Sequence, residues 1–281
     1  MTVPLFPARR GVGAVAADST GETRLSARDV TLGYDRRVIA EHLDLDIPDA
    51  SFTVIVGPNA CGKSTLLRAL SRLLKPSAGE VVLDGRAITS YRSKEAARLI
   101  GLLPQTSIAP EGITVRDLVR RGRYPYQKLT RQWSRDDEAA VDEAMVATAV
   151  DDLADRPVDE LSGGQRQRVW AALALAQGTP MLLLDEPTTF LDIAHQIELL
   201  DLFRRLNRGG RTLVAVLHDL NHAARYATHL VVMKDGAIVA QGRPGDIVTA
   251  DLVEHVFGLA CVVIADPVTG TPLVVPLDAG A

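Results

Sequence analysis

A glycine-rich stretch from Gly57 to Thr65 is the part of the sequence that most directly predicts a chemical site. It reads GPNACGKST, which fits the pattern G-x-x-x-x-G-K-[ST], and it lies between the apolar run FTVIV and a run with helical spacing. In such a loop, successive backbone N–H groups and the positive end of a helix converge on phosphate groups. Lys63 is expected to reach the β- and γ-phosphates of a nucleotide, and Ser64 to bind Mg²⁺. The predicted phosphate-binding residues are Gly57, Pro58, Asn59, Ala60, Cys61, Gly62, Lys63, Ser64 and Thr65.

Two adjacent acidic residues, Asp185 and Glu186, follow the apolar run MLLL and form a second candidate site. Asp185 is expected to hold Mg²⁺, directly or through water. Glu186 is then placed beside the γ-phosphate, where it can polarise an attacking water as a general base. Two solvated acids at the end of a strand are common, so this pair alone does not identify a function. Kinases and GTPases also fit both motifs.

The elements around these motifs alternate between strands and helices. Short apolar runs at 52–57 and 181–187 are typical of strands covered on both faces, and 63–74 has helical spacing. Polar–apolar alternation predicts paired edge strands at 24–34 and 38–47. The sequence therefore predicts an α/β core that a helical insertion interrupts. Further predictions are helices at 115–124, 135–150, 160–178 and 193–207, a strand at 212–219, hairpins at 80–88 and 229–242, and two C-terminal strands within 260–277.

Composition restricts the class of protein. The 281 residues, 47% hydrophobic and 23% charged, are enough for one large domain or two small lobes. A net charge of −4 argues against a nucleic-acid partner. Cys61 and Cys261 are interpreted as reduced thiols of a cytosolic protein. No run approaches 18 apolar residues, and residues 1–24 lack an apolar core of signal-peptide length, so a membrane role would need a partner chain.

The segment LSGGQ, Leu161 to Gln165, opens a predicted helix about twenty residues before LLLDEP. With the phosphate loop upstream and the acidic strand downstream, it resembles the signature of ATP-binding cassette (ABC) ATPases. The resemblance extends from about Leu25 to the C-terminus. It implies a P-loop NTPase fold of the ABC type, with an antiparallel β subdomain and a helical subdomain at about 106–170. The implied division is a mobile lead-in at 1–24, an ATPase domain at 25–260 and a hairpin-like tail at 261–281.

The resemblance also implies roles for individual residues. Tyr34 would stack on adenine, Gln105 would sense Mg²⁺ and the attacking water, and His218 would contact the γ-phosphate and fix that water together with Glu186. The implied catalytic set is Glu186, His218, Gln105 and Lys63, and the implied Mg²⁺ set is Ser64, Gln105 and Asp185. The implied cofactors are ATP and Mg²⁺.

The resemblance further implies that two chains share each ATP. Ser162, Gly163, Gly164 and Gln165 form a helix N-terminus suited to an anion. In the family this motif binds the γ-phosphate held by the opposite subunit. Leu191 and Asp192 match the loop that runs along the dimer interface. A homodimer is therefore expected.

Two residues of the loop depart from related phosphate loops. Ala60 stands where glycine is common, and alanine would cost about 1 kcal/mol or more if the position needs a positive φ. Cys61 beside it is either a small residue that fits or a thiol whose alkylation blocks ATP, because the loop's positive field favours a thiolate.

Other segments resemble the ATPases of iron-siderophore, haem and cobalamin importers. These are RRGRYPY from Arg120 to Tyr126, DEPTTFLDIAHQIELLDL and AVLHDLNHAARYATHLVVMKDG. The tail GLACVVIADPVTGTPLVVPL resembles that of ferric-siderophore ATPases, especially the ferric-enterobactin type, which places a ferric siderophore ahead of haem and cobalamin. Implied partners are an integral-membrane permease and, indirectly, an extracytoplasmic siderophore-binding protein, at the cytoplasmic face of the inner membrane. A soluble ABC ATPase acting on nucleic acid or ribosomes is a remote alternative.

A run of basic residues lies in the predicted helical insertion. It forms either a solvated face or part of the groove that receives a coupling helix of the permease. Its members are Arg116, Arg120, Arg121, Arg123, Lys128 and Arg131.

Overall fold

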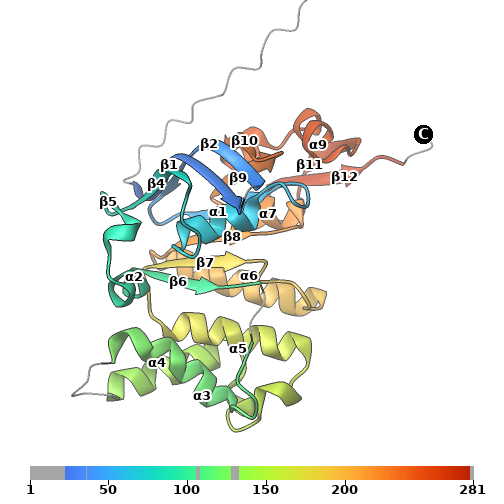
Figure 1. The fold of residues 1–281 in the computed structure, drawn as a ribbon. Helices are drawn as coiled ribbons and strands as arrows, with labels where there is room; N and C mark the ends of the chain where they lie inside the picture. The colour runs from blue at the N-terminus through green and yellow to red at the C-terminus, as the bar shows by residue number, and fades with distance from the viewer. Residues whose placement is uncertain (1–22, 36, 106–107, 128–132, 279–281) are drawn as a thin grey trace, which may run out of the picture.

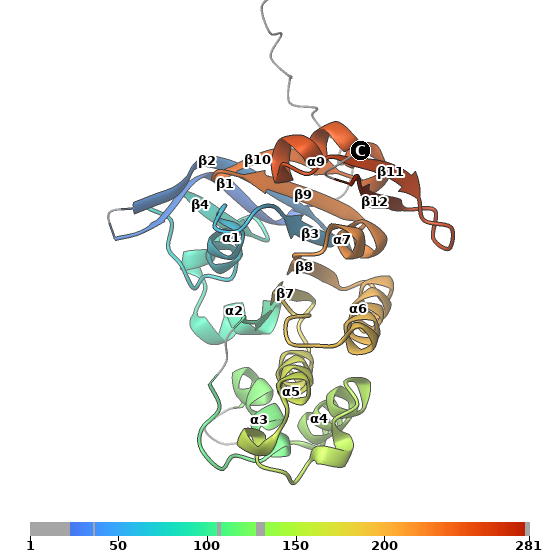
Figure 2. The same ribbon diagram turned by 90° about the vertical axis from the view of Figure 1, so that its right-hand side faces the viewer.

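The computed structural model describes residues 23–35, 37–105, 108–127 and 133–278. Most of the predicted lead-in, together with Lys128 and Arg131 of the basic run, lies outside the described residues. The described chain contains three β-sheets and a group of helices at the end opposite the antiparallel sheet (Figures 1 and 2).

A six-stranded sheet forms the centre, in the order β10-β9-β3-β8-β7-β6. All neighbouring pairs in it are parallel except β9 and β10, which form the hairpin predicted at 229–242. Every residue of β3, β7 and β8 is buried, as the continuous apolar runs predicted. The strands are β3 (Phe52–Val56), β6 (Ile100–Leu103), β7 (Met181–Asp185), β8 (Thr212–Val216), β9 (His229–Lys234) and β10 (Ala237–Gly242).

A second sheet, wholly antiparallel, has the order β2-β1-β4-β5. Its strands are β1 (Thr23–Tyr34), β2 (Arg37–Pro48), β4 (Ala78–Leu83) and β5 (Arg86–Ala87). Helix α1 (Lys63–Leu70) packs between the two sheets, since Leu66 and Leu70 share one apolar cluster with Leu25 of β1 and Ile55 of β3. This packing fixes the loop that precedes α1.

Helices cover the other face of the central sheet and form the insertion. Phe52 and Val54 of β3 belong to a second apolar cluster with Phe203 of α6 and Ala223 of α7. The helices are α2 (Ser93–Leu99), α3 (Val115–Arg120), α4 (Arg135–Ala147), α5 (Gly163–Ala176), α6 (Ile193–Arg208), α7 (Leu220–Tyr226), α8 (Pro244–Ile247) and α9 (Ala250–Phe257), with 3₁₀ turns at Ile88–Ser90, Arg121–Tyr126, Asp151–Leu153 and Val158–Glu160. A final hairpin pairs β11 (Cys261–Ala265) with β12 (Pro272–Pro276).

One predicted helix changes form. The pattern at 115–124 gives α3 and then a 3₁₀ helix that contains Pro125. A Cβ at Gly122 would lie 2.4 Å from the carbonyl oxygen of Leu173, so the 3₁₀ helix packs directly on the backbone of α5. Pro125 lacks the N–H that a regular helix would use. Tight packing and proline together override the helical pattern.

Three of the described members of the basic run, Arg116, Arg120 and Arg123, form ion pairs with acidic residues. Arg116 pairs with Glu138 and Asp142 of α4, and Arg120 also pairs with Glu138. The side chain of Arg123 is only 12% exposed; its Nε lies 2.8 Å from Asp137 and another nitrogen donates to the carbonyl of Ala176 at the end of α5. Arg123 therefore belongs to neither of the two surfaces that the sequence suggested.

The buried carboxylate of Asp137 depends on this arrangement. Burial raises the pKa of Asp137, but hydrogen bonds from Ser134 and Arg123 outweigh it and hold the pKa below its ordinary value.

No helix in the described part of the chain has the length and apolar character needed to cross a membrane.

Replacing Arg123 by glutamate should destabilise the protein strongly, because it leaves two carboxylates facing each other in a nearly closed site. The expected loss in the free energy of unfolding is roughly 3–5 kcal/mol. Urea denaturation measures it, with Arg121→Glu at a neighbouring exposed position as the control that should change stability by less than about 0.5 kcal/mol. Equal stability losses in the two variants would contradict the structural role of Arg123.

Candidate functional site

The phosphate loop joins the end of β3 to the start of α1, as predicted. A Cβ at Gly57 would lie 2.1 Å from the carbonyl oxygen of Met233, and Gly62 has a φ of +103°, so both positions favour glycine. Lys63 is 5% exposed, and its Nζ donates to the carbonyls of Gly57 and Pro58 at 2.9 and 2.8 Å. The ammonium group is therefore held at the loop that would surround a phosphate.

The two departures in this loop behave differently. Ala60 has a φ of +61°, so it adopts the left-handed conformation, which costs about 1–2 kcal/mol for a residue with a Cβ. Cys61 is 5% exposed, and burial raises the pKa of its thiol more than the nearby charge of Lys63 lowers it. Burial therefore favours the neutral thiol and supports the first of the two interpretations, a small residue that fits the loop.

Ser64 and Asp185 meet beside the loop. The Ser64 hydroxyl donates to Oδ1 of Asp185 at 2.8 Å, and Asp185 is 3% exposed. Burial raises the pKa of Asp185, and the Ser64 hydrogen bond offsets part of that effect. A hydroxyl and a carboxylate are the oxygen ligands that Mg²⁺ prefers, so this pair fits the predicted ion.

The carboxylate of Glu186, just after β7, contacts side chains that follow two other strands. Its Oε1 lies 2.7 Å from Nε2 of His218, which follows β8. Its Oε2 accepts a hydrogen bond at 2.8 Å from Nε2 of Gln105, which follows β6. Glu186 itself follows β7 with a φ of +52°, a conformation that L-residues adopt at a cost and that is concentrated at functional sites. The Glu186 side chain is 11% exposed, so its carboxylate is held and partly shielded from solvent.

Tyr34 lies at the edge of the same region. It ends β1, is 41% exposed, and its hydroxyl accepts a hydrogen bond from Arg68 of α1 at 3.0 Å. The ring is therefore anchored to the helix that the phosphate loop opens. Arg68 was not singled out from the sequence, because nothing in the local pattern distinguishes it from other basic residues on helices.

The LSGGQ residues form a separate site at the start of α5. Ser162 caps the helix: its hydroxyl accepts from the N–H of Gln165, and the Gln165 side chain accepts from the N–H of Ser162. Within the described residues, no hydrogen bond or ion pair joins Ser162–Gln165 to the phosphate loop. Figures 1 and 2 show α5 and α1 in different parts of the molecule. Within one chain the phosphate loop is therefore joined to Asp185 through Ser64, but not to the LSGGQ residues.

The segment after Glu186 carries the predicted interface residues. Leu191 is 7% exposed and packs near α5, since a Cβ at Gly164 would lie 3.4 Å from it. Asp192 caps α6 and accepts from both the N–H and Nδ1 of His195, at 3.0 and 2.8 Å. Phe190 and Ile193, which the sequence analysis missed, are 76% and 78% exposed. The sequence offers no signal for them, because their exposure is visible only in the fold; large exposed apolar side chains suit a protein contact.

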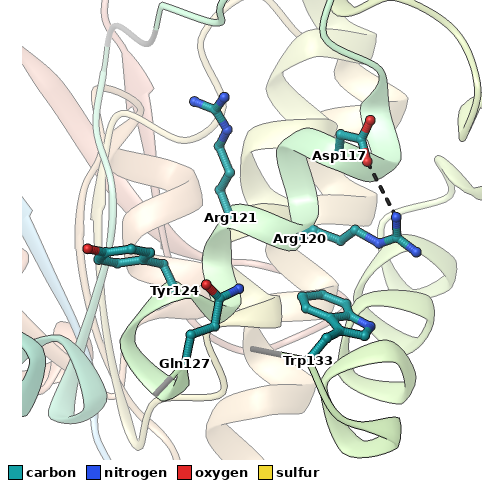
Figure 3. A pocket seen from close by; sticks show the side chains of 6 residues that line it. All are labelled: Asp117, Arg120, Arg121, Tyr124, Gln127 and Trp133. Atoms are coloured by element: carbon teal, nitrogen blue, oxygen red, sulfur yellow. Dashed lines mark hydrogen bonds and ion pairs between the residues drawn. The ribbon is translucent and has the colours of Figure 1, made fainter. Parts of the chain in front are cut away.

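A separate open pocket of about 630 Å³ lies in the helical insertion (Figure 3). The guanidinium groups of Arg120 and Arg121 and the rings of Tyr124 and Trp133 line it, together with Asp117 and Gln127. Tyr124 is 61% exposed. The pocket therefore offers positive charge and aromatic surface in one place.

Cys61 should react slowly with maleimide in the folded protein because its thiol is buried and its pKa is raised. In a Cys261→Ser background at neutral pH, we expect native labelling to be at least about tenfold slower than labelling in guanidinium chloride. Mass spectrometry of the time course measures both rates. Fast native labelling that ATP prevents would instead support a reactive thiol.

The comparisons with known proteins agree with this geometry. The ABC transporter family matches residues 40–189. The ferric enterobactin transport ATP-binding protein of Escherichia coli (strain K12) is 60% identical over 255 residues, which cover 90% of this chain and 94% of that protein. A probable siderophore transport system ATP-binding protein of Bacillus subtilis (strain 168) is 54% identical over 261 residues, covering 92% and 95%.

A solved structure with a similar fold is a dimer of an ATP-binding cassette. It is a dimeric, post-hydrolysis state of an ATP-binding cassette bound to ADP and Pi, with a TM-score of 0.71 and 28% identity, covering 78% of this chain and 98% of that one. The predicted α/β fold, with its antiparallel sheet and helical insertion, is confirmed. The chain belongs to the ABC transporter family and is one of its ATP-binding cassette ATPases.

Proposed function

We propose that this chain is the ATP-hydrolysing subunit of an importer that moves a ferric siderophore through a separate membrane permease. The observation that carries the hydrolytic role is the carboxylate of Glu186, fixed between His218 and Gln105. Ser64 of α1 also donates a hydrogen bond to Asp185 at the end of β7, and the Lys63 ammonium is bound to carbonyls of the phosphate loop that follows β3. The proposed base, ion site and phosphate-binding loop thus lie at the same edge of the central sheet.

Each of these residues has a role in hydrolysis. Lys63 and the loop N–H groups bind the β- and γ-phosphates. Glu186 accepts a proton from the attacking water as a general base, and His218 holds the Glu186 carboxylate in position while contacting the γ-phosphate. Mg²⁺, held by Ser64 and Asp185 with Gln105 nearby, would neutralise charge on the phosphates. Tyr34 stacks on the adenine ring.

The separated LSGGQ motif indicates that the site is completed by a second chain. Ser162 and the following glycines offer a capped helix N-terminus to the γ-phosphate bound by the partner. Leu191 and Asp192 then lie along the contact between the two chains. ATP favours the closed pair, and loss of the γ-phosphate contacts on hydrolysis reopens it.

The pocket of Figure 3 is where we place the contact with the permease. Arg121 and Tyr124 are exposed there and suit an acidic or polar coupling helix with apolar side chains. The 3₁₀ helix that carries both residues packs on α5 through Gly122, and α5 begins at the LSGGQ motif. Closure of two chains would therefore move the pocket and the permease together. In this proposal the chain works at the cytoplasmic face of the inner membrane, bound to the permease.

The cargo is proposed from similarity. Both relatives described above are named for siderophore transport, and the tail residues resemble the same group. Haem and cobalamin are the alternative cargoes. An extracytoplasmic siderophore-binding protein would deliver the cargo to the permease without touching this chain. Nucleic acid is not among the proposed partners, in keeping with the net charge of −4.

Uptake of radiolabelled ferric siderophore tests this proposal. Cells that lack the gene should regain uptake with the wild-type chain. Glu186→Gln should leave uptake at least about tenfold lower, because the general base is lost while the fold is kept. Protein levels measured by immunoblot provide the control.

Intact siderophore uptake in the deleted cells, with loss of haem or cobalamin uptake, would contradict the siderophore and leave the ATPase role standing. Full rescue by Glu186→Gln would contradict the role of Glu186 as the base.

A further inference from the structure

The C-terminal hairpin is fastened to the helix that follows His218. The side-chain amide of Asn221, in α7, makes two hydrogen bonds to the backbone of Val274 in β12. Its Oδ1 accepts from the Val274 N–H at 2.7 Å, and its Nδ2 donates to the Val274 carbonyl at 3.2 Å. Asn221 thus pairs with the strand as a neighbouring strand would.

The sequence of β12 leaves a single backbone N–H on the edge that faces away from β11. N–H groups of alternate residues point to the same side of a strand, so Pro272 and Pro276 share the outer edge with Val274. Proline has no N–H to donate. The Val274 N–H is therefore the one donor that this edge offers within β12, and Asn221 satisfies it. Val274 is 7% exposed, so this bond is shielded from water.

Helix α7 is short and held at several points. Asp219 caps it by accepting from the N–H of His222 at 2.7 Å. Ala223 and Ala224 are fully buried, and the Tyr226 hydroxyl donates to Asp201 of α6. Arg225 also lies 3.6 Å from Asp266 at the tip side of the hairpin. Two of these contacts, those of Asn221 and Arg225, tie the helix to the hairpin.

His218 depends on this helix for its position. It lies between the end of β8 and the α7 cap Asp219, and its side chain is 48% exposed. In the described residues the imidazole has one polar side-chain contact, to Glu186 at 2.7 Å. With only one such contact, the orientation of the half-exposed imidazole is set mainly by the backbone conformation of His218. On the other side of His218, the N–H of Leu217 is fixed to the carbonyl of Ile55, so the α7 side is where the backbone orientation can change.

We propose that Asn221 is a positioning residue for ATP hydrolysis, through which the β11–β12 hairpin holds α7 and so keeps His218 on Glu186. The inference rests on the role proposed above for His218. Without the clamp, the first turn of α7 loses its contact with β12 and the imidazole loses its alignment with the carboxylate, while Ala223, Ala224 and Tyr226 still hold the rest of the helix. Nucleotide binding uses the phosphate loop and Tyr34 and is unaffected by this change.

Asn221→Ala in the full-length chain tests the proposal, with Asn207→Ala as a matched control. The Asn207 amide likewise makes two hydrogen bonds to the backbone, donating to the carbonyls of Ala50 and Arg211, and neither of these residues belongs to α7 or to the hairpin. We expect Asn221→Ala to lower kcat for ATP about tenfold with KM changed less than about twofold. Asn207→Ala should leave kcat within about twofold.

A second measurement separates positioning from general damage. In a His218→Ala background, Asn221→Ala should change kcat by less than about twofold, because its effect passes through His218. The ring resonance of His218, assigned by its loss in His218→Gln, should shift in Asn221→Ala and stay in place in Asn207→Ala. Asn221→Asp, which keeps the acceptor for Val274, serves if the alanine variant fails to fold, and should show a smaller shift of the same resonance.

The possible failures are distinguishable. Equal losses of kcat in the two asparagine variants, or an unshifted His218 resonance, would overturn the role of Asn221. A full further loss of kcat in the His218→Ala background would do the same. Wild-type turnover in His218→Ala would instead overturn the proposed role of His218, since that result does not depend on the clamp.

Discussion

The contact of one carboxylate with two neighbours organises this molecule. Glu186 lies between the imidazole of His218 and the amide of Gln105, and these three residues follow three adjacent parallel strands. The carboxyl ends of parallel strands meet at one edge, which is where α/β sheets place their ligands. The φ of +52° at Glu186 shows that the backbone accepts a cost to hold this arrangement.

Other elements of the structure either form this edge of the sheet or connect it to the helical insertion and the C-terminal hairpin. Helix α1 packs between two sheets and fixes the phosphate loop, while Ser64 ties that loop to Asp185 beside Glu186. The helical insertion carries the LSGGQ motif, so in the proposed dimer each chain contributes half of two sites. Helix α7 extends the constraint to the C-terminal hairpin through Asn221. A hairpin far along the sequence thereby contributes to the geometry of hydrolysis.

Local motifs were predictable from the sequence, and long-range contacts were not. The phosphate loop and the Asp185–Glu186 strand end follow from short patterns, because neighbouring residues alone decide a strand–loop–helix turn. Arg123 could not be assigned, since its burial depends on Asp137 and on the end of α5. The sequence also could not decide between the two interpretations of Cys61, because the burial that raises the pKa of its thiol comes from surrounding elements. The spaced prolines of β12 were a readable signal for an edge strand, but nothing local identifies Asn221 as its partner.

The central claim is that each ATP is enclosed by the phosphate loop of one chain and the LSGGQ motif of another. Light scattering of Glu186→Gln after gel filtration tests this arrangement, because the variant keeps the phosphate loop and is expected to bind ATP but to hydrolyse it poorly. One chain has a mass of 30.2 kDa. We expect ATP and Mg²⁺ to double that mass, and adding Gly163→Arg at the LSGGQ motif to return it to that of a single chain. A Glu186→Gln protein that stays at the mass of one chain in saturating ATP, or a dimer that Gly163→Arg leaves intact, would contradict it.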